Sequence, residues 1–179
     1  MKSLLGIFII FFGITFLISS GCTVQEERTY TDTELQSLMD NYTQLWNGGD
    51  IELIKTLYTE ECVRHNADVG DSNGPEGIKG FVEWVYGAYP DFKVTFGEPM
   101  KFNDGFVMLF KATGTNDGPL SEDMPATGKE VSFTGAGVSI IENGKIKEEW
   151  VYYNQLYIYE QMGYELELED EDEEEEDND

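Results

Sequence analysis

Residues 130–154 have the sequence EVSFTGAGVSIIENGKIKEEWVYYN, and this stretch decides the fold. Two runs rich in β-branched and aromatic side chains flank Asn143-Gly144. Because both turn residues tolerate positive φ, the stretch predicts a long β-hairpin. Gly135 and Gly137 interrupt the first run, and glycines inside a long strand often mark a bulge or a sharp bend. We therefore expect a bent hairpin that curls around a pocket.

The chain before this hairpin has the pattern of helices followed by strands. Apolar residues recur at helical spacing in residues 35–46, 51–58 and 74–85. Strand-like runs occupy residues 61–66, 92–102 and 106–115. A long loop rich in Gly and Pro, residues 116–129, suggests a flap at the mouth of a cavity. Three helices followed by an antiparallel sheet predict an α+β domain over residues 31–164.

The N-terminus has the pattern of a targeting segment. Lys2 precedes an apolar run at residues 4–18, and small residues lead to Cys22. The pattern resembles a bacterial lipoprotein signal, with residues 1–21 as the signal peptide and Cys22 as the lipid-acylated first residue. The alternative is a single-span anchor, because Ser19 stands where such signals usually have Leu, Val or Ile.

Both alternatives place the domain outside the cytoplasm, in the cell envelope. Residues 22–30 then form a polar tether between the membrane and the domain. Thr23, rather than Asp, follows the cysteine, and by the same resemblance this favours the outer membrane if the source has one.

The charge of the chain is large and unevenly distributed. The formal net charge is −25, from 36 acidic and 11 basic residues. Residues 165–179 contain 12 of the acidic residues and none of the basic ones, which predicts a solvated, disordered tail. So acidic a chain is a poor candidate for nucleic-acid binding, since phosphate contacts need Lys and Arg.

The sequence contains no recognised metal or cofactor motif. His65 is the single histidine, and Asp68 and Asp71 near it do not have the spacing of a metal site. No phosphate loop or dinucleotide fingerprint occurs, so we expect no cofactor. Of the two cysteines, Cys22 is assigned to lipid, which leaves Cys62 without a disulfide partner and most simply a small buried hydrophobe.

Several short motifs lie in order within residues 31–164. They are Trp46-Asn47-Gly48-Gly49-Asp50, Val63-Arg64-His65-Asn66, Gly74-Pro75-Glu76-Gly77-Ile78, Tyr89-Pro90-Asp91-Phe92, Ala112-Thr113-Gly114-Thr115, Pro125-Ala126-Thr127-Gly128-Lys129 and Asn143-Gly144-Lys145-Ile146-Lys147-Glu148-Glu149-Trp150. Together they resemble the SnoaL-like polyketide cyclase and ester cyclase family, within the nuclear transport factor two-like superfamily. The resemblance implies a cone-shaped barrel in which three helices pack on a strongly curved antiparallel sheet around a deep apolar cavity. It also implies a homodimer through the outer face of the sheet, which carries Trp150 and Tyr152.

The resemblance also implies an acid/base ring closure, but two expected residues differ here. The family's acid follows the tryptophan of the Glu-Glu-Trp strand, where this chain has Val151, and the counterpart of a frequent neighbouring histidine is Gly137. Strand alternation places Glu149 on the same face as Val151, so Glu149 is the first candidate base. Alternatively, Glu149 is salt-bridged or solvated near the open rim.

His65 is the second candidate for proton transfer, as the one side chain that normally titrates near neutral pH. Alternatively, it pins the loop at residues 67–73 through hydrogen bonds. The candidate cavity-lining residues are Tyr42, Trp46, Phe81, Trp84, Phe110, Phe133, Val151 and Tyr153, although such aromatic side chains are more often plain core.

Two functional hypotheses follow. The first is an exported binding domain whose cavity holds a small hydrophobic molecule, with the cyclase acid replaced by Val151. The second is a cofactor-independent cyclase, isomerase or hydratase that acts on a small carbonyl or polyketide-like compound through Glu149 and His65.

Overall fold

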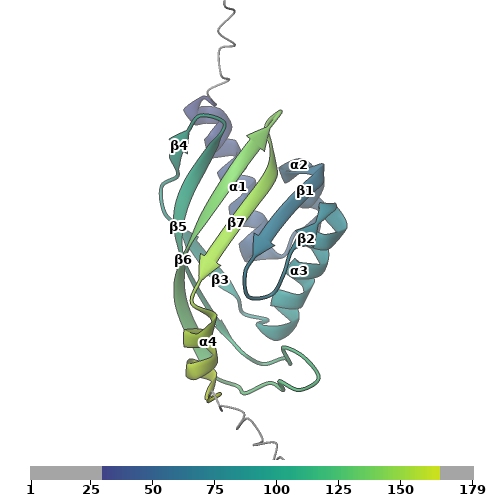
Figure 1. The fold of residues 1–179 in the computed structure, drawn as a ribbon, viewed down its shortest axis with the longest axis vertical. Helices are drawn as coiled ribbons and strands as arrows, with labels where there is room; N and C mark the ends of the chain where they lie inside the picture. The colour runs from purple at the N-terminus through teal and green to yellow at the C-terminus, as the bar shows by residue number, and fades with distance from the viewer. Residues whose placement is uncertain (1–29, 166–179) are drawn as a thin grey trace, which may run out of the picture.

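In the computed structural model, which describes residues 30–165, helices pack against one face of a single curved sheet (Figure 1). The expected signal peptide, Cys22, most of the tether and most of the acidic tail lie outside the described residues. Within residues 30–165, no helix combines the length and the apolar character needed to cross a membrane. The arrangement confirms the predicted α+β cone, with one helix more than the sequence indicated.

The first helix, α1 (Asp32–Gly48), forms as its sequence predicts. Thr31 caps it in a capping box with Glu34, and Gly49 ends it with a φ of 63°. Its apolar stripe faces the sheet, where a continuous apolar side is buried most easily. The buried residues are Leu35, Leu38, Met39, Tyr42, Leu45 and Trp46.

The second predicted helix is shorter than expected. The structure has a 3₁₀ turn, η1 (Ile51–Leu53), followed by a single turn of α2 (Ile54–Leu57). Strand β1 (Tyr58–Asn66) then begins three residues before the predicted strand. Tyr58 pairs with Ile146 of the final hairpin, so a contact distant in sequence draws it into the sheet. A short strand, β2 (Ser72–Asn73), precedes α3 (Gly74–Ala88).

The remaining strands follow the predicted segments. They are β3 (Lys93–Phe96), β4 (Met100–Phe102), β5 (Gly105–Thr115), β6 (Glu130–Glu142) and β7 (Lys145–Tyr153). The sheet order is β2-β1-β7-β6-β5-β3, with β4 paired to β5. Only β1 and β7 run parallel within this sheet. The predicted hairpin is β6–β7, and its turn residues Asn143 and Gly144 have φ values of 53° and 79°.

The bulge expected at Gly135 and Gly137 lies elsewhere. The β6–β7 register continues past both glycines and shifts between Ile140 and Ile141. Gly135 is required for a different reason, because a Cβ there would lie 2.3 Å from Cζ of Phe110. The backbone of β6 therefore passes closely over an aromatic ring of β5.

The helix that the sequence interpretation missed is α4 (Gln155–Met162). Asn154 caps it by accepting a hydrogen bond from the Tyr157 N–H. Ile158 and Met162 pack against the end of α3 in a second, smaller core. In Figure 1 this helix closes one end of the fold, below the β6–β7 hairpin.

The long loop at residues 116–129 is docked onto α3. Gly118 N–H donates to the Ala88 carbonyl, and Trp84 Nε1 donates to the Leu120 carbonyl. The buried side chain of Asn116 joins the two ends of the loop, since it donates to Gly118 O and accepts from Thr127 N. Figure 1 shows this loop at the same end of the fold as α4.

Candidate functional site

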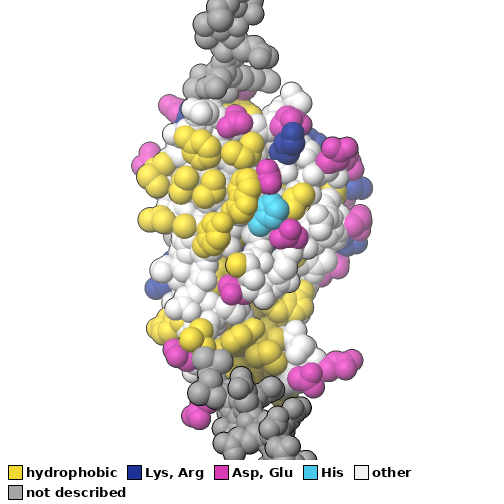
Figure 2. All heavy atoms as spheres, in the orientation of Figure 1, with side chains coloured by type: hydrophobic (Ala, Val, Ile, Leu, Met, Phe, Trp, Pro, Cys, Tyr) yellow, Lys and Arg dark blue, Asp and Glu magenta, His cyan; other side chains and the backbone are white. Residues whose placement is uncertain are grey.

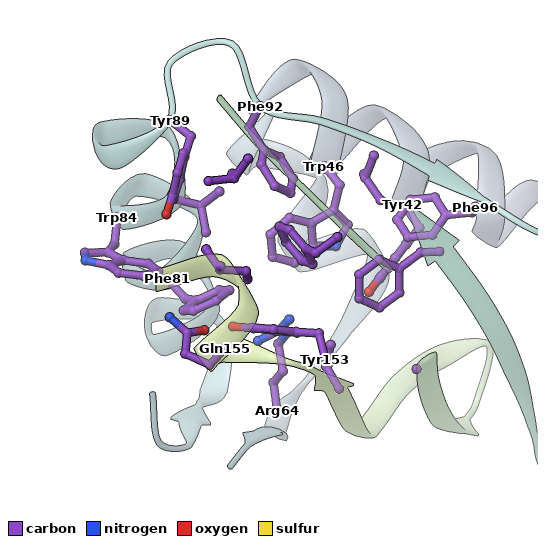
Figure 3. Close-up of a pocket in the computed structure, with 18 of the residues that line it drawn as sticks. Tyr42, Trp46, Arg64, Phe81, Trp84, Tyr89, Phe92, Phe96, Tyr153 and Gln155 are labelled. Carbon is purple, nitrogen blue, oxygen red and sulfur yellow. The ribbon is translucent and has the colours of Figure 1, made fainter. Parts of the chain in front are cut away.

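The inner face of the sheet, α1, α3 and α4 enclose a cavity of about 80 Å³ (Figure 3). It is lined by Tyr42, Trp46, Arg64, Phe81, Trp84, Val85, Tyr89, Phe92, Val94, Phe96, Met108, Phe110, Val131, Phe133, Gly137, Val151, Tyr153, Gln155 and Ile158. Aromatic rings form most of the wall. Phe133 links two of them, with ring centroids 6.4 Å from Phe110 and 5.2 Å from Tyr153. Such a wall suits the apolar body of a small organic molecule.

All eight side chains predicted to face the cavity lie in its wall. Their role in binding a ligand stays a prediction. The sequence interpretation missed Gln155 and Ile158 because it missed α4. It also missed Arg64, although strand alternation in β1 places this charge opposite His65, on the apolar inner face.

Val151 and Gly137 are direct neighbours on the inner face of the sheet, paired in register between β7 and β6. Both line the cavity. At the two positions where the resemblance implies an acid and a histidine, this cavity therefore has an isopropyl group and a hydrogen atom. Neither can transfer a proton.

Glu149 lies behind the cavity wall, not at the open rim. It is fully buried, and its Oε1 accepts a 2.7 Å hydrogen bond from the Tyr42 hydroxyl. Arg64 stands opposite Glu149 on the parallel strand β1, and its Nε lies 3.0 Å from Glu149 Oε2. The hydroxyls of Tyr58 and Ser139 each lie 3.4 Å from the carboxylate. We call these five side chains the Glu149 cluster.

The partners of Glu149 in this cluster offset the unfavourable burial of its carboxylate. Removing an ionised carboxylate from water is unfavourable by several kcal/mol unless a partner charge and hydrogen bonds replace the lost hydration. Arg64 supplies the partner charge at 5% exposure. Glu149 is thus part of an ion pair behind the wall, and it is not among the residues that line the cavity.

The two tyrosines of this cluster have raised pKa values. Burial, followed by the negative charge of Glu149, raises the pKa of Tyr42 well above its ordinary value. The same two causes, in the same order, raise the pKa of Tyr58. Both phenols therefore stay protonated near neutral pH and act as hydrogen-bond donors.

His65 lies on the opposite face of the sheet from the cavity. Its ring stacks on Trp150, with centroids 5.2 Å apart, and its nitrogens lie 3.1 Å from Asp71 and 3.1 Å from Glu148. Partial burial lowers the pKa of His65, but the hydrogen bonds to Glu148 and Asp71 outweigh it, so the pKa is raised. The Asp71 contact ties the loop after β1 to the sheet. His65 does not reach the cavity.

The outer face around His65 carries several exposed apolar side chains. Leu109 is 60% exposed and Tyr152 is 55% exposed. Figure 2 shows apolar side chains gathered on this face beside the histidine. The predicted alternation of β7 is confirmed, with Glu149 and Val151 inside and Tyr152 outside.

Other reactive groups lie away from the cavity. Burial raises the pKa of the Cys62 thiol to about 11, so the thiol is protonated near neutral pH. Within residues 30–165, no group of three His, Cys, Asp or Glu side chains is placed to hold a metal ion. The described residues with polar side-chain atoms that line the cavity are thus Arg64, Gln155, Tyr42, Tyr89, Tyr153, Trp46 and Trp84.

Comparison with known proteins identifies the family. The family model described as SnoaL-like polyketide cyclase matches residues 36–162. The chain belongs to the SnoaL-like polyketide cyclase family. No curated protein sequence matches this SnoaL-like chain.

Solved structures share the fold of this SnoaL-like domain. TsrD from Streptomyces laurentii superposes with a TM-score of 0.67 at 22% identity, covering 75% of this chain and 98% of TsrD. A protein from Jannaschia sp. CCS1 named as a SnoaL-like polyketide cyclase gives 0.65 at 16% identity, covering 78% of this chain and 99% of that one. A Catenulispora acidiphila protein with a ketosteroid isomerase-like fold gives 0.60 at 16% identity, covering 70% and 92%. At these identities, the likeness is one of fold.

Proposed function

We propose that this SnoaL-like domain binds a small hydrophobic molecule in its cavity without converting it. The observation that carries the proposal is the pairing of Val151 with Gly137 in a wall made mostly of aromatic and aliphatic side chains. The wall is apolar enough to bind a hydrophobic molecule, but it has no side chain that can transfer a proton at these two positions. Burying about 150 Å² of apolar ligand surface would contribute about 4 kcal/mol at about 25 cal/mol per Å².

Gly137 provides a way to test this proposal. A Cβ added there would have its nearest neighbours at 3.9 Å, the Met108 Cε atom and the Trp150 carbonyl. Gly137→Leu should therefore fill the cavity without displacing the backbone. Gly80→Leu is the matched control, because Gly80 is an exposed position of α3 with no atom near its added Cβ.

The assay is ligand-detected NMR with ethylbenzene, a small apolar probe. We expect the wild type and Gly80→Leu to bind ethylbenzene and Gly137→Leu to bind it at least tenfold more weakly, as for the loss of about 1.4 kcal/mol. Equal binding by all three proteins would place the probe outside the cavity. No binding by the wild type would refute the proposal.

A second candidate function is acid/base catalysis, and one contact favours it. Tyr42 lines the cavity and its hydroxyl donates a hydrogen bond to Glu149, so one hydrogen bond connects a residue of the cavity wall to the buried carboxylate. Exchange of the methyl protons of acetophenone with D₂O is a suitable test, because it requires only abstraction of a proton and no later chemical step. Catalysis through Glu149 predicts a loss of about 10²–10⁴ in exchange rate for Glu149→Gln. No exchange by the wild type favours the binding function.

The proposal also includes assembly and location. The exposed Leu109 and Tyr152 support pairing of the outer sheet face with a second copy of the chain, since contiguous apolar surface is commonly an interface. The N-terminal sequence pattern supports export, with lipid on Cys22 and the domain held at the cell envelope.

A further inference from the structure

The guanidinium of Arg64 has an unused hydrogen-bond donor in the cavity. Its Nε lies 3.0 Å from Glu149 Oε2 in an ion pair without hydrogen-bond geometry, and its Nη1 is buried with no hydrogen-bond partner among residues 30–165. The group lies over two aromatic rings, with Cζ 4.4 Å from the Phe81 ring centroid and 5.3 Å from that of Trp46. Buried charged donors are nearly always satisfied, so an unused one in a cavity indicates a missing acceptor.

Tyr153 supplies a second donor in the same part of the cavity. Its hydroxyl accepts a 3.0 Å hydrogen bond from Nδ2 of Asn66. The orientation of Asn66 is fixed, because its Oδ1 accepts hydrogen bonds from the backbone N–H groups of Asp68 and Val69. The Tyr153 hydroxyl is thus an acceptor toward Asn66, and within residues 30–165 no acceptor takes its own proton.

Both donors belong to residues that line the same cavity. Figure 3 shows the Arg64 guanidinium and the Tyr153 hydroxyl in the same part of the cavity, next to Gln155. Burial raises the pKa of Tyr153, whereas the Asn66 hydrogen bond and the Arg64 charge act in the opposite direction.

The charges of Arg64 and Glu149 limit which ligand group these two donors can bind. Among the described residues that line the cavity, Arg64 is the one charged side chain, and the carboxylate of Glu149 already balances it. A ligand carboxylate would bring a second negative charge into a buried site that has one positive charge. A neutral oxygen acceptor would satisfy both donors and leave the balance unchanged.

We infer that Arg64 Nη1 and the Tyr153 hydroxyl form a subsite for a neutral carbonyl oxygen, so that the cavity selects an apolar ketone or ester and rejects the corresponding carboxylate. The inference rests on the proposed binding function and adds the chemistry of the ligand's polar end. It requires no chemical conversion of the ligand.

Three probes of similar size test the inference by ligand-detected NMR. Ethylbenzene has no acceptor, acetophenone has a neutral one, and benzoate has a charged one. We expect the wild type to bind acetophenone roughly 10- to 100-fold more tightly than ethylbenzene, the range for a hydrogen bond to a charged donor. Benzoate should bind more weakly than acetophenone.

Tyr153→Phe should reduce acetophenone binding by about tenfold and leave ethylbenzene binding unchanged, since it removes one neutral hydrogen bond. Tyr152→Phe is the matched control, because Tyr152 is the adjacent residue on the outer face. Arg64→Met combined with Glu149→Gln removes both buried charges together, and this double variant should weaken the preference for acetophenone to the roughly tenfold that the remaining Tyr153 hydroxyl supplies.

The outcomes separate the two proposals. If ethylbenzene and acetophenone bind equally, or if benzoate binds more tightly than acetophenone, the carbonyl subsite is wrong and the binding cavity stands. A preference for acetophenone that keeps its full wild-type size in both Tyr153→Phe and the double variant would also overturn the subsite. If no probe binds to the wild type, both proposals fail.

Discussion

Replacing Glu149 by Gln should destabilise the protein far more than an ordinary polar substitution. The glutamine keeps the shape of the side chain but removes its charge, so the Arg64 guanidinium, with 6% of its side chain exposed, loses its counter-charge. Breaking a buried ion pair in this way costs about 3–5 kcal/mol. That is a large part of the about 5–15 kcal/mol by which folded domains are usually stable.

A double-mutant cycle that combines Glu149→Gln with Arg64→Met tests the size of this loss in the free energy of unfolding. Each single variant leaves one buried charge unpaired, whereas the double variant leaves neither. The double variant should therefore be more stable than the sum of the two single losses predicts, by about 2–3 kcal/mol, which lies within the range measured for directly coupled residues. The assay is urea unfolding at pH 7, with the slope m compared across variants to check that each folds to the same extent.

A matched control uses an ion pair at the surface. Glu142 and Lys147 lie 2.7 Å apart, and about half of each side chain is exposed. Glu142→Gln should leave the free energy of unfolding nearly unchanged, since water already screens this pair. Strictly additive losses in the Glu149 and Arg64 cycle, or a Glu149→Gln protein as stable as the Glu142→Gln control, would refute a buried charge-balanced cluster.

Three further predictions concern the outer face and the N-terminus. The pKa of His65 is raised above its ordinary value of 6.5, so its contacts with Glu148 and Asp71 stabilise the fold fully below pH 6.5 and lose this effect as pH rises through the folded-state pKa. The free energies of urea unfolding of the wild type and His65→Gln should therefore differ most below pH 6.5 and converge at alkaline pH, and a difference that is constant with pH would contradict this. Sedimentation should report a dimer that Leu109→Glu dissociates and the exposed Gly80→Leu does not, whereas a monomeric wild type at high concentration would remove the dimer proposal. Intact mass of the membrane-extracted protein should show cleavage before Cys22 plus acyl chains, and a chain that still begins at Met1 would leave only the anchor.

The sequence predicted those parts of the fold that local patterns determine. The β6–β7 hairpin follows from Asn143-Gly144, and the inner and outer faces of β7 follow from strict alternation. The helix α4 was missed because Gln155–Met162 is rich in aromatic and β-branched residues, which are also frequent in strands. Its caps at Asn154 and Gly163 were visible in the sequence and could have identified it.

The candidate site was predicted less completely, because its central contacts join residues far apart in the chain. Arg64 and Glu149 meet through the parallel pairing of β1 with β7, and no local pattern gives the register of two strands 85 positions apart. The same pairing carries His65 to the outer face beside Trp150. The side of each strand could be predicted, but not which side chains face one another.

Binding of a small hydrophobic molecule in the cavity can be measured most directly through the chemical shifts of the methionine methyl groups. Met108 lines the cavity and is 1% exposed, whereas Met100 lies at the surface and is 57% exposed. When the ¹³C-methyl-methionine-labelled protein is titrated with ethylbenzene, we expect a saturable change in the chemical shift of the Met108 methyl group and no change for Met100. A Met108 resonance that stays fixed while the probe saturates, or equal shifts at both methionines, would contradict it.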